Sequence, residues 1–492
     1  MALPVSLYST AQVRALDTYA IETLGIAGYT LMERAGEAAL RCLRTRWPVA
    51  QHVTIVCGPG NNGGDGYVLA RLARAAGLTV TVLAASPPDG LKGDAREASR
   101  AWLACGGESR PYESRLLEHD GIIVDALLGT GLHGPVREQM ARVIHDLNAA
   151  GRPVLALDVP SGLDSDTGMP LGAAVRADCT MTFVGLKTGL FVGDGPQFAG
   201  VVCFDDLGLR APVVNPPPAR IERIVETEIQ RALPRRRRSA HKGDFGRVLI
   251  VGGGVGMPGA ARLSGEACLR IGAGLVTVAV APQNLPAVAA GRPELICLPW
   301  SEPGELREAL ERAELIAIGP GLGRSEWARA ALHAVLGAGK PLVLDADALN
   351  LIAESGASVQ SEWILTPHPG EAGRLLGIST AEVQRDRLGA LERLTARYGG
   401  IVVLKGAGTL VGGPGRTPAL CERGNPGMAS AGMGDVLTGV IAGIFAQSRD
   451  AWLAARVGVL AHALAGDAAA RNGERGLLAG DVIEELRRCI ND

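Results

Sequence analysis

Short apolar runs alternate with amphipathic stretches through the first third of the chain. The apolar runs fall at residues 53–57, 79–84, 121–128 and 153–159, and helical patterns lie between them at residues 65–76, 94–104 and 136–149. Strands and helices in alternation are typical of a mostly parallel sheet that is wrapped by helices. Residues 10–46, before the first strand, have the pattern of a long helical arm.

The alternation stops near residue 210 and then begins again. Pro212, Asn215 and the run Pro216–Pro218 cannot continue a helix or an inner strand, so we place a linker at residues 210–225. Further strands are expected at residues 247–251, 275–281, 315–318, 341–345, 363–366 and 401–404, and two buried helices at residues 432–470. Because 492 residues are also too many for one ordinary core, we predict two α/β domains, residues 1–215 and residues 225–492.

The charge balance argues against a nucleic-acid or membrane-surface partner. Lys and Arg number 49, Asp and Glu number 51, the formal charge is −2, and aromatic residues make up only 4% of the chain. The run Arg235–Arg238 could be a nucleic-acid patch, but no further basic cluster lies near it, so a solvated or anion-facing edge is the better interpretation. We expect small-molecule partners, no nucleic acid, no membrane, and a homo-oligomer.

The nine cysteines are scattered and none forms a Cys-x-x-Cys pair, which indicates a reducing compartment and no zinc site. The N-terminus lacks a charged region followed by an apolar one, so no signal peptide is expected. No uninterrupted apolar run approaches the ~20 residues that span a bilayer. These features predict a cytoplasmic protein.

The first strand ends in a glycine-rich run, Gly58-Pro59-Gly60-Asn61-Asn62-Gly63-Gly64-Asp65-Gly66. Backbone N–H groups in such a turn can approach a phosphate at the positive end of the following helix. The run matches a dinucleotide fingerprint, but Leu83–Ser86, where a ribose-binding acid would lie, holds no carboxylate, so an ordinary Rossmann dehydrogenase is disfavoured. A tight turn with Asx caps is the alternative, although five glycines within nine residues exceed what one turn needs.

Two further strand ends should meet this run at one edge of the sheet, because sites in open α/β sheets form beyond the carboxyl ends of the strands. Asp125 and Asp158 lie at these ends; each could simply cap the next helix, but with the nearby asparagines they favour a shared polar pocket. Asn62, Asp125 and Ser161 offer hard oxygen ligands with few carboxylates, a set that suits a monovalent cation.

Two more segments belong to the same region. Residues Gly129 to Pro135 form a second glycine-rich loop that could close over a phosphate. Lys187 follows another strand, where it is either a structural ion-pair partner or, if desolvated, a proton-transfer group.

A second glycine-dense segment, Gly424–Asp435, leads into an apolar helix near the C-terminus. Consecutive N–H groups before a helix form an anion hole, and Asp435 is placed to accept a proton from a hydroxyl that attacks a terminal phosphate. This is expected of a small-molecule phosphotransferase, whereas an Asp that only caps a helix does not explain the small residues of the turn.

Other strand ends support the second site. Lys405–Thr409 suits nucleotide phosphates, and Gly319–Gly323 is a further loop for phosphate or substrate. His368 alone would be interpreted as a packed loop histidine, but its two flanking prolines hold it rigidly enough to line a pocket. The chain has no Gly-x4-Gly-Lys-Ser/Thr run, so a P-loop enzyme is excluded.

Together these motifs resemble the family of bifunctional NAD(P)H-hydrate repair enzymes, through Asn61–Gly66, Asp158–Gly162, Thr366–Glu371, Lys405–Thr409 and Gly432–Asp435. The resemblance covers nearly the whole chain. It implies a Rossmann-like three-layer αβα domain with NAD(P)HX epimerase activity, followed by a ribokinase-like α/β domain with NAD(P)HX dehydratase activity. It also implies the substrates NADHX and NADPHX, ADP or ATP as co-substrate, K⁺ in the first domain and Mg²⁺ in the second.

The resemblance assigns roles to particular residues. The candidate catalytic groups are Asp435, Asp158 and Lys187. Substrate contacts are expected from Asn61, Asn62, Gly63, Gly64, Asp65, Gly129, Thr130, Gly131, Leu132, His133, Gly134, Pro135, Asp158, Ala260, Gly321, His368 and Asp435. Nucleotide contacts are expected from Lys405, Gly406, Ala407, Gly408, Thr409 and Gly434, and K⁺ ligation from Asn62, Asp125 and Ser161.

Two rival interpretations stay open at this point. A vitamin-precursor kinase of the ribokinase-like fold would leave a stable phosphorylated product, whereas repair releases phosphate and restores reduced nicotinamide. The N-terminal domain could instead be a ligand-binding regulator, in which case isolated residues 1–215 would bind the hydrated nucleotide without interconverting its epimers.

Overall fold

The computed structural model describes residues 3–117, 121–209, 217–356 and 362–491. It divides into two compact units, Met1–Ile221 and Glu222–Asp492, each with its own sheet and apolar core. The division falls inside residues 210–225, where the sequence predicts a linker. Residues 210–216 of that segment, with Pro212, Asn215 and Pro216, lie outside the described residues.

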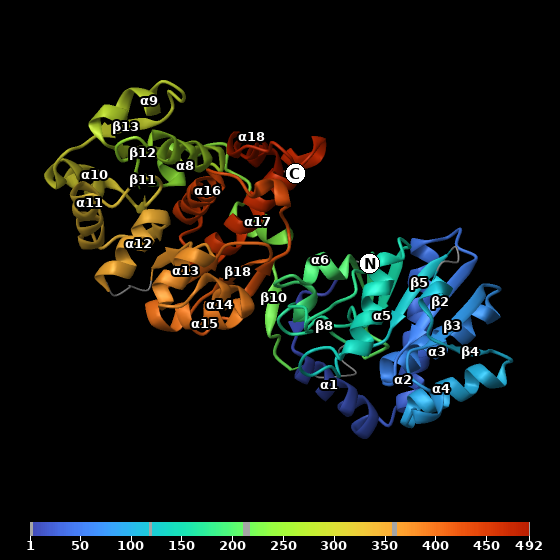
Figure 1. The fold of residues 1–492 in the computed structure, drawn as a ribbon. Coiled ribbons are helices and arrows are strands. Elements are labelled where there is room, and N and C mark those ends of the chain that lie inside the picture. The colour runs from blue at the N-terminus through green and yellow to red at the C-terminus, as the bar shows by residue number, and fades with distance from the viewer. Residues whose placement is uncertain (1–2, 118–120, 210–216, 357–361, 492) are drawn as a thin grey trace. The chain divides into compact units, whose positions relative to one another are not determined.

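The first unit is built on a seven-stranded sheet with parallel neighbours in the order β4-β3-β2-β5-β6-β7-β9. The strands are β2 (His52–Cys57), β3 (Thr79–Ala84), β4 (Ser109–Pro111), β5 (Ile122–Ala126), β6 (Val154–Leu157), β7 (Cys179–Phe183) and β9 (Val201–Asp205). A separate parallel pair joins β1 (Ser6–Tyr8) to β8 (Leu186–Lys187). Figure 1 shows β2, β3 and β5 side by side.

Helices cover both faces of this sheet. The helices are α1 (Thr10–Thr18), α2 (Gly28–Arg46), α3 (Asn61–Ala75), α4 (Gly93–Ala104), α5 (Glu138–Ala149) and α6 (Gly195–Ala199). Ile55 of β2 packs in a core with α2, α3 and α4, whereas its neighbour Val56 packs in a second core with α5. Successive residues of a strand point to opposite faces, so one apolar strand serves two cores. The Rossmann-like three-layer αβα prediction is confirmed.

Two expectations about the first unit are wrong in detail. The helical arm predicted at residues 10–46 is interrupted by a π-helical turn, Tyr19–Thr23, and by Gly25, whose φ of +68° favours a residue without a Cβ atom. The glycine-rich turn is shorter than expected, because α3 already begins at Asn61 with Gly60 as its N-cap. The polar side chains of that motif therefore belong to the first turns of a helix.

The second unit contains a sheet in the order β13-β12-β11-β14-β15-β16-β17-β18-β19-β10. Its strands are β10 (Ile221–Arg223), β11 (Arg247–Val251), β12 (Leu275–Val280), β13 (Ile296–Pro299), β14 (Leu315–Ile318), β15 (Leu342–Leu344), β16 (Trp363–Leu365), β17 (Ile401–Leu404), β18 (Thr409–Gly412) and β19 (Ala419–Cys421). Neighbours from β13 to β17 are parallel, and β18 is antiparallel to both β17 and β19. The ribokinase-like α/β prediction for this unit is confirmed.

The helices of the second unit include two that run through its core. They are α7 (Thr227–Ala232), α8 (Pro258–Arg270), α9 (Leu285–Ala289), α10 (Arg307–Arg312), α11 (Glu326–Gly337), α12 (Ala346–Ser355), α13 (Pro369–Leu376), α14 (Thr380–Arg385), α15 (Arg387–Tyr398), α16 (Met433–Ser448), α17 (Ala451–Ala469) and α18 (Ala479–Cys489). α16 and α17 are the two apolar helices that the sequence predicts, and both line the core together with α8. Figure 1 shows α8, α16 and α17 close together.

Glycines let α16 approach α8 closely. A Cβ atom at Gly439 would lie 2.1 Å from the carbonyl oxygen of Ser264, which no side chain could tolerate. The Ser264 hydroxyl donates a hydrogen bond of 2.7 Å to the carbonyl of Asp435. This packing therefore positions the first turn of α16, where Asp435 lies.

Among the described residues, one helical segment, Ala451–Asn472, has the length and hydropathy to cross a membrane, and 72% of that window is buried inside the structure. Its apolar character is therefore accounted for by the core of the second unit.

Candidate functional sites

A cavity of about 870 Å³ opens in the first unit, beside the residues that follow β2, β5 and β6. Its wall contains most of the residues that the sequence selected: Asn61, Asn62, Asp65, Gly129, Thr130, Gly131, Leu132, His133, Pro135, Asp158 and Lys187. The structure thus brings together motifs that are far apart in the chain. Of the described residues that were selected in the first unit, Gly63, Gly64, Gly134, Asp125 and Ser161 are not on this wall.

The two buried glycines have packing roles. A Cβ atom at Gly63 would lie 2.1 Å from the carbonyl oxygen of Gly58, and one at Gly64 would lie 2.6 Å from the Met32 side chain. They allow α3 to begin directly against the end of β2 and against α2. The side chains of Asn61, Asn62 and Asp65 are thereby placed at the cavity.

Asp158 and Lys187 form a nearly enclosed ion pair. Lys187 is only 1% exposed, and its ammonium donates to the Asp158 carboxylate, to the Thr182 hydroxyl at 3.1 Å and to the Phe183 carbonyl at 2.7 Å. All three ammonium protons are therefore engaged. Asp158 has a φ of +66°, a left-handed backbone that Asp and Asn tolerate better than other side chains.

Three more carboxyl groups, those of Asp17, Asp65 and Asp94, line the same cavity as this pair. Burial raises the pKa of Asp65 well above its usual value, and the charges of Asp158 and Asp17 raise it further. Burial also raises the pKa of Asp17 to about 6, opposed by Lys187 and assisted by Asp158. Asp17 belongs to α1 and carries no motif, so the sequence reasoning missed it. The sequence did contain one signal for this residue: Asp17 follows the apolar residues Val13 and Leu16 on the same helix, and the structure buries both.

The three predicted cation ligands, Asn62, Asp125 and Ser161, are buried, and Asn62 lies on the cavity wall. The side chain of Asn62 is buried, and neither Nδ2 nor Oδ1 finds a hydrogen-bond partner within the described part of the chain. The Ser161 hydroxyl and backbone N–H both donate to the Asp125 carboxylate, at 2.6 and 2.8 Å. Burial raises the pKa of Asp125 to about 6 despite these hydrogen bonds. An unpartnered buried amide next to buried oxygens fits a bound cation, because such groups seldom stay unsatisfied.

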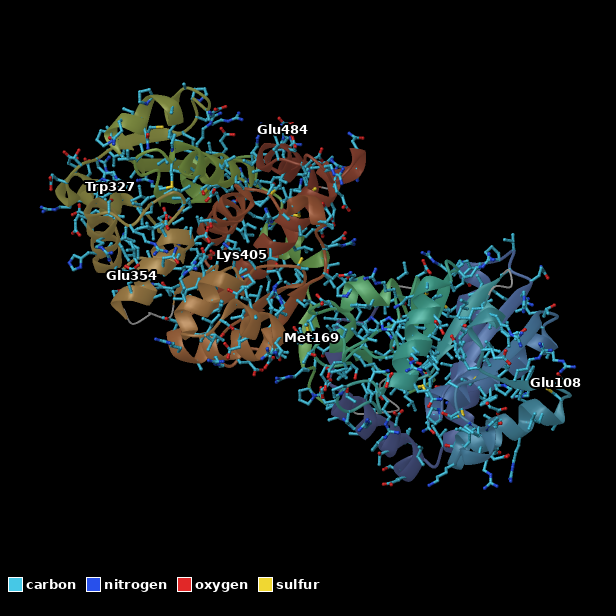
Figure 2. All side chains as sticks on the ribbon, in the orientation of Figure 1. Glu108, Met169, Trp327, Glu354, Lys405 and Glu484 are labelled. Carbon is cyan, nitrogen blue, oxygen red and sulfur yellow. The ribbon has the colours of Figure 1, made fainter. Side chains whose placement is uncertain are left out.

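In the second unit, three strand ends and one helix meet at a buried carboxylate. Asp345 follows β15, and its side chain is only 1% exposed. It accepts hydrogen bonds from Lys405 Nζ at 2.7 Å, Thr366 Oγ1 at 2.8 Å and Thr438 Oγ1 at 2.8 Å. Figure 2 labels Lys405 within this unit. Asp345 links three motifs that the sequence singled out separately.

Asp435 lies near this cluster, in the first turn of α16. Burial raises the pKa of Asp435 to about 7, with further contributions from Asp345 and Asp347 that outweigh the opposing charge of Lys405. A Cβ atom at Gly434 would lie 3.3 Å from Lys405 Nζ. The structure therefore brings Asp435, Gly434 and Lys405 into one site.

The ammonium of Lys405 is held as a cation by its neighbours. Burial alone would lower the pKa of Lys405, but the charges of Asp345 and Glu371 outweigh burial and raise it. Glu371 Oε2 lies 3.8 Å from Lys405 Nζ. A fixed positive charge at the end of β17 suits phosphate binding.

Arg387 supports the loop that follows Lys405. Its guanidinium donates to the carbonyls of Leu404, Lys405 and Gly408, each at 3.3 Å. Arg387 is 5% exposed, and burial lowers its pKa to about 10. Sequence reasoning missed this residue, because an arginine at the start of an amphipathic helix resembles any solvated one.

The remaining predicted residues fall in two places. His368 caps α13, where its Nδ1 accepts the N–H of Gly370 at 3.0 Å, and burial together with Lys405 lowers its pKa. His368 thus lies close enough to Lys405 for the lysine charge to affect its pKa. Gly321 and Ala260 are adjacent to each other, because a Cβ atom at Gly321 would lie 3.0 Å from that of Ala260.

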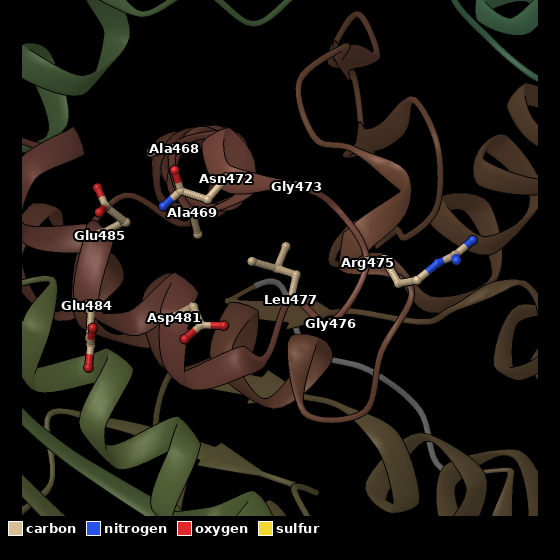
Figure 3. A pocket seen from close by; sticks show the side chains of 10 residues that line it. All are labelled: Ala468, Ala469, Asn472, Gly473, Arg475, Gly476, Leu477, Asp481, Glu484 and Glu485. Atoms are coloured by element: carbon tan, nitrogen blue, oxygen red, sulfur yellow. The ribbon is translucent and has the colours of Figure 1, made fainter.

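A smaller pocket of about 330 Å³ lies between α17 and α18 (Figure 3). Its described lining residues, which include Arg475, Leu477 and Asp481, contain none that the sequence selected.

Three cysteines that are distant in the sequence meet in the first unit. The Sγ atoms of Cys42 and Cys179 lie 3.6 Å apart, and those of Cys179 and Cys203 lie 3.7 Å apart. Spacing along the chain could not reveal this group, because its members come from α2, β7 and β9.

The chain is similar to known proteins over its whole length. Residues 28–189 match the family described as YjeF-related protein N-terminus, and residues 248–488 match the family described as NAD(P)H-hydrate dehydratase. The chain is 48% identical over 486 residues to the bifunctional NAD(P)H-hydrate repair enzyme Nnr of Coxiella burnetii, which covers 99% of both chains. It is 44% identical over 492 residues to the Escherichia coli enzyme of the same name, covering 100% of this chain and 95% of that one.

A solved structure resembles the second unit. It is the ADP/ATP-dependent NAD(P)H-hydrate dehydratase from Bacillus subtilis, co-crystallised with ATP and Mg²⁺. The identity is 31% and the TM-score 0.50, over 54% of this chain and 96% of that one.

Proposed function

Because the chain belongs to the family of bifunctional NAD(P)H-hydrate repair enzymes, we propose that each of its two units performs one half of that repair. The first unit interconverts the R and S epimers of hydrated NADH and NADPH. The second unit dehydrates the S epimer to NAD(P)H at the expense of ADP, which gives AMP and phosphate. The substrate is a reduced nicotinamide with water added across one ring double bond, so that its hydroxyl lies on a carbon beside the ring nitrogen.

Phosphorylation explains why a kinase-like fold would catalyse a dehydration. Hydroxide leaves poorly, whereas phosphate leaves well when the ring nitrogen supplies its lone pair. Asp435 would take the proton of the substrate hydroxyl as its oxygen attacks the terminal phosphoryl group. A carboxyl group with a pKa of about 7 suits this task, because it is ionised in half of the molecules at neutral pH and still accepts a proton readily.

The nucleotide phosphates would be held by Lys405 and by the loop Gly406–Thr409. Arg387 donates to the carbonyls of Lys405 and Gly408. The backbone N–H groups of the loop would then be the donors available to a phosphate. Gly434 keeps the space beside the Lys405 ammonium open. Gly321 and Ala260, with His368, would contact the substrate.

Epimerisation requires only modest acid–base help, because the adjacent nitrogen makes the C–O bond labile. Asp158 is the favoured proton-transfer group, and Lys187 fixes its position in the cavity. Asn61, Asn62 and Asp65 would contact the hydrated nucleotide from one side, and residues 129–135 from another.

Two cations fit the residues present. Asn62, Asp125 and Ser161 would hold K⁺, which supplies a fixed positive charge, and the unpartnered Asn62 amide supports this assignment. Mg²⁺ would accompany the nucleotide phosphates and neutralise their charge. Burial is the main cause of the raised pKa of Asp435, and a divalent cation would relieve the further contribution of the Asp345 and Asp347 carboxylates.

The observation that carries the proposal is the meeting of Lys405, Gly434 and Asp435 around Asp345. The test is incubation of the full chain with an equal mixture of hydrated NADH epimers and ADP or ATP, following reduced-nicotinamide absorbance and phosphate together. Complete recovery of NADH with one phosphate per NADH is expected. A stable phosphorylated product without recovered NADH would instead indicate a vitamin-precursor kinase.

A further inference from the structure

We propose that Asp17 is the catalytic proton donor of the epimerisation site, acting with the Asp158–Lys187 ion pair. The proposal deepens the function proposed for the first unit and rests on it. Asp17 lies on the wall of the same cavity as Asp158 and Lys187, but it comes from α1, a separate element.

Among the described residues, Lys187 is the only cation of the cavity that is ion-paired with one of its carboxylates, although Arg14 and Arg137 also line the wall. Lys187 is the ammonium that contacts Asp158, and its remaining protons are engaged by Thr182 and Phe183. The charges of Asp158 and Lys187 act on both Asp17 and Asp65, and the charge of Asp17 also acts on Asp65. Because the one paired ammonium is already bonded to Asp158, the two unpaired carboxyl groups favour proton uptake.

Asp17 is better suited than Asp65 to give up that proton. The pKa of Asp65 is raised well above the usual range, so Asp65 holds its proton tightly. Asp17, with a pKa of about 6, is both protonated often enough and acidic enough to donate. The other charged or titratable groups on the cavity wall are Arg14, Asp94, His133 and Arg137. Two carboxyl groups with different environments can divide the roles of acid and base.

In the R-to-S direction, the Asp17 carboxyl donates its proton to the hydroxyl on the carbon beside the ring nitrogen. The C–O bond then breaks, and water leaves as the nitrogen lone pair forms an iminium bond. Water then adds to the opposite face while Asp158 accepts one of its protons. Exchange with solvent returns a proton to Asp17 and removes one from Asp158, so no proton or electron is consumed.

The test compares epimerisation by the full chain and by its Asp17→Asn variant, starting from the pure R epimer and subtracting the spontaneous rate. We expect kcat to fall by about 100-fold or more, with KM changed by less than about threefold. The decline of wild-type kcat/KM above about pH 6 should disappear in the variant. Asp17→Glu keeps a carboxyl group and should restore that pH limb. The matched control is Glu22→Gln, which removes an exposed carboxylate from the neighbouring π-helical turn.

Dehydration of the pure S epimer by the second unit serves as a control for protein quality. Wild-type kcat in Asp17→Asn, or a slower rate with an unchanged pH profile, overturns the role of Asp17. Neither result overturns the function proposed for the first unit. A wild-type chain that dehydrates the S epimer but does not epimerise the R epimer overturns the proposed function of the first unit.

Independently, we infer that Cys42, Cys179 and Cys203 form a site for a soft monovalent metal ion, Cu(I). Their three Sγ atoms all lie within 4.8 Å of one another. Sulfurs bound at about 2.3 Å to one metal ion lie about 4 Å apart, close to the observed separations of 3.6 and 3.7 Å. No histidine or carboxylate of the described residues joins the group, which disfavours four-coordinate zinc and favours a trigonal thiolate site.

Binding would replace thiol protons by metal–sulfur bonds without any change of oxidation state. Cys203 is partly exposed and gives access to the group, while Arg46 supplies positive charge near Cys42 and Cys203. The test is a Cu(I) titration of the reduced full chain in competition with bicinchoninate. One Cu(I) per chain is expected in the wild type and in Cys105→Ser, an exposed cysteine outside the group, and none in Cys179→Ser or Cys203→Ala. Absence of uptake, or uptake that survives both cluster substitutions, overturns the inference.

Discussion

Lys405 Nζ lies 2.7 Å from Asp345 Oδ1, and the two side chains are 17% and 1% exposed. Replacing Lys405 by Met would leave a buried carboxylate with only its two threonine donors. Removing one partner of a buried pair typically costs about 3 kcal/mol or more, so the second unit of Lys405→Met should lose about that much unfolding free energy. Urea unfolding of the full chain, monitored by tryptophan fluorescence, measures this, since Trp300, Trp327, Trp363 and Trp452 all lie in the second unit. Lys242→Met, at an exposed lysine of the same unit, is the control.

The pH dependence of this contribution has a definite sign. Burial lowers the pKa of Lys405, but the charges of Asp345 and Glu371 outweigh burial, so the pKa is raised in the folded state. Its stabilisation is therefore fully present below the usual lysine pKa and is lost only as the pH rises through the higher folded-state value. Wild type and Lys405→Met should converge in stability at strongly alkaline pH, and a constant difference there would contradict the assignment.

Asp435→Asn should abolish dehydration without unfolding the site. The substitution keeps the size of the side chain but removes the proton acceptor, so we expect kcat to fall by about 10² to 10⁴-fold. Nucleotide affinity, measured by calorimetry with ADP and Mg²⁺, should change by less than about threefold, because Lys405 and its loop are untouched. Glu311→Gln removes an exposed carboxylate elsewhere in the unit and is the control. Near-normal turnover by Asp435→Asn would refute the role of this residue.

The same residue predicts a pH profile. Asp435 accepts a proton only when it is ionised, and its pKa is raised to about 7 by burial and by Asp345. The wild-type kcat/KM of dehydration should therefore fall tenfold per pH unit well below pH 7, whereas an exposed aspartate would sustain activity to about pH 4. Initial rates with the pure S epimer at saturating ADP, from about pH 5 to pH 9, test this expectation. The residual activity of Asp435→Asn should lack that limb.

The sequence predicted the strands of both units well, because apolar runs in parallel sheets are long and bounded by glycine-rich turns. The strands at Arg247–Val251, Leu315–Ile318 and Ile401–Leu404 have the predicted bounds. The strands β1, β4, β9, β10, β13, β18 and β19 were not predicted, and all of them except β9 have only three or four residues, which carry too little periodicity. The start of α3 was also misjudged, because Asn61 and the glycines after it are loop-forming residue types that tertiary packing places in a helix.

Site residues could be predicted only where a motif marks them. Asp17, Asp345 and Arg387 act through contacts with residues distant in the chain, and none of these contacts is visible in local spacing. The cysteine group has the same origin, because three elements bring it together. Asp345 shows this most clearly, because its three hydrogen-bond donors come from Thr366, Lys405 and Thr438.

Asp158 should tolerate Asn better than Ala. Its φ of +66° is a backbone conformation that Asn adopts readily, whereas Ala should lose about 1 kcal/mol of unfolding free energy to strain. Both substitutions remove the proton-transfer group, so both should abolish R-to-S conversion and leave dehydration of the S epimer intact. Epimer ratios and thermal unfolding of the two variants test these expectations together. If Asp158→Asn also lost dehydration, a structural role would account for the residue better.

Gly434→Ala should weaken nucleotide binding specifically. Gly434 lies within a helix, where Ala is favoured, so the fold should not suffer. The new methyl group would lie 3.3 Å from Lys405 Nζ and 3.8 Å from Asp345 Oδ2, in the space assigned to the phosphates. We expect the KM for ADP to rise by about tenfold, which corresponds to about 1.4 kcal/mol. Gly480→Ala, at a helical position where an added Cβ meets no other atom, is the control.

Asn62→Leu should change stability and activity in opposite directions. The Asn62 amide is buried without a hydrogen-bond partner among the described residues, and replacing such a group by an apolar one of similar shape is neutral or stabilising. In K⁺-free buffer the variant should therefore unfold at the same temperature as the wild type or higher. K⁺ binds only the folded site, so added K⁺ should raise the unfolding temperature of the wild type but not of Asn62→Leu. Epimerisation by the variant should be slow and insensitive to K⁺. Equal stabilisation of both proteins by K⁺, with Na⁺ at the same ionic strength as the reference, would place the cation elsewhere.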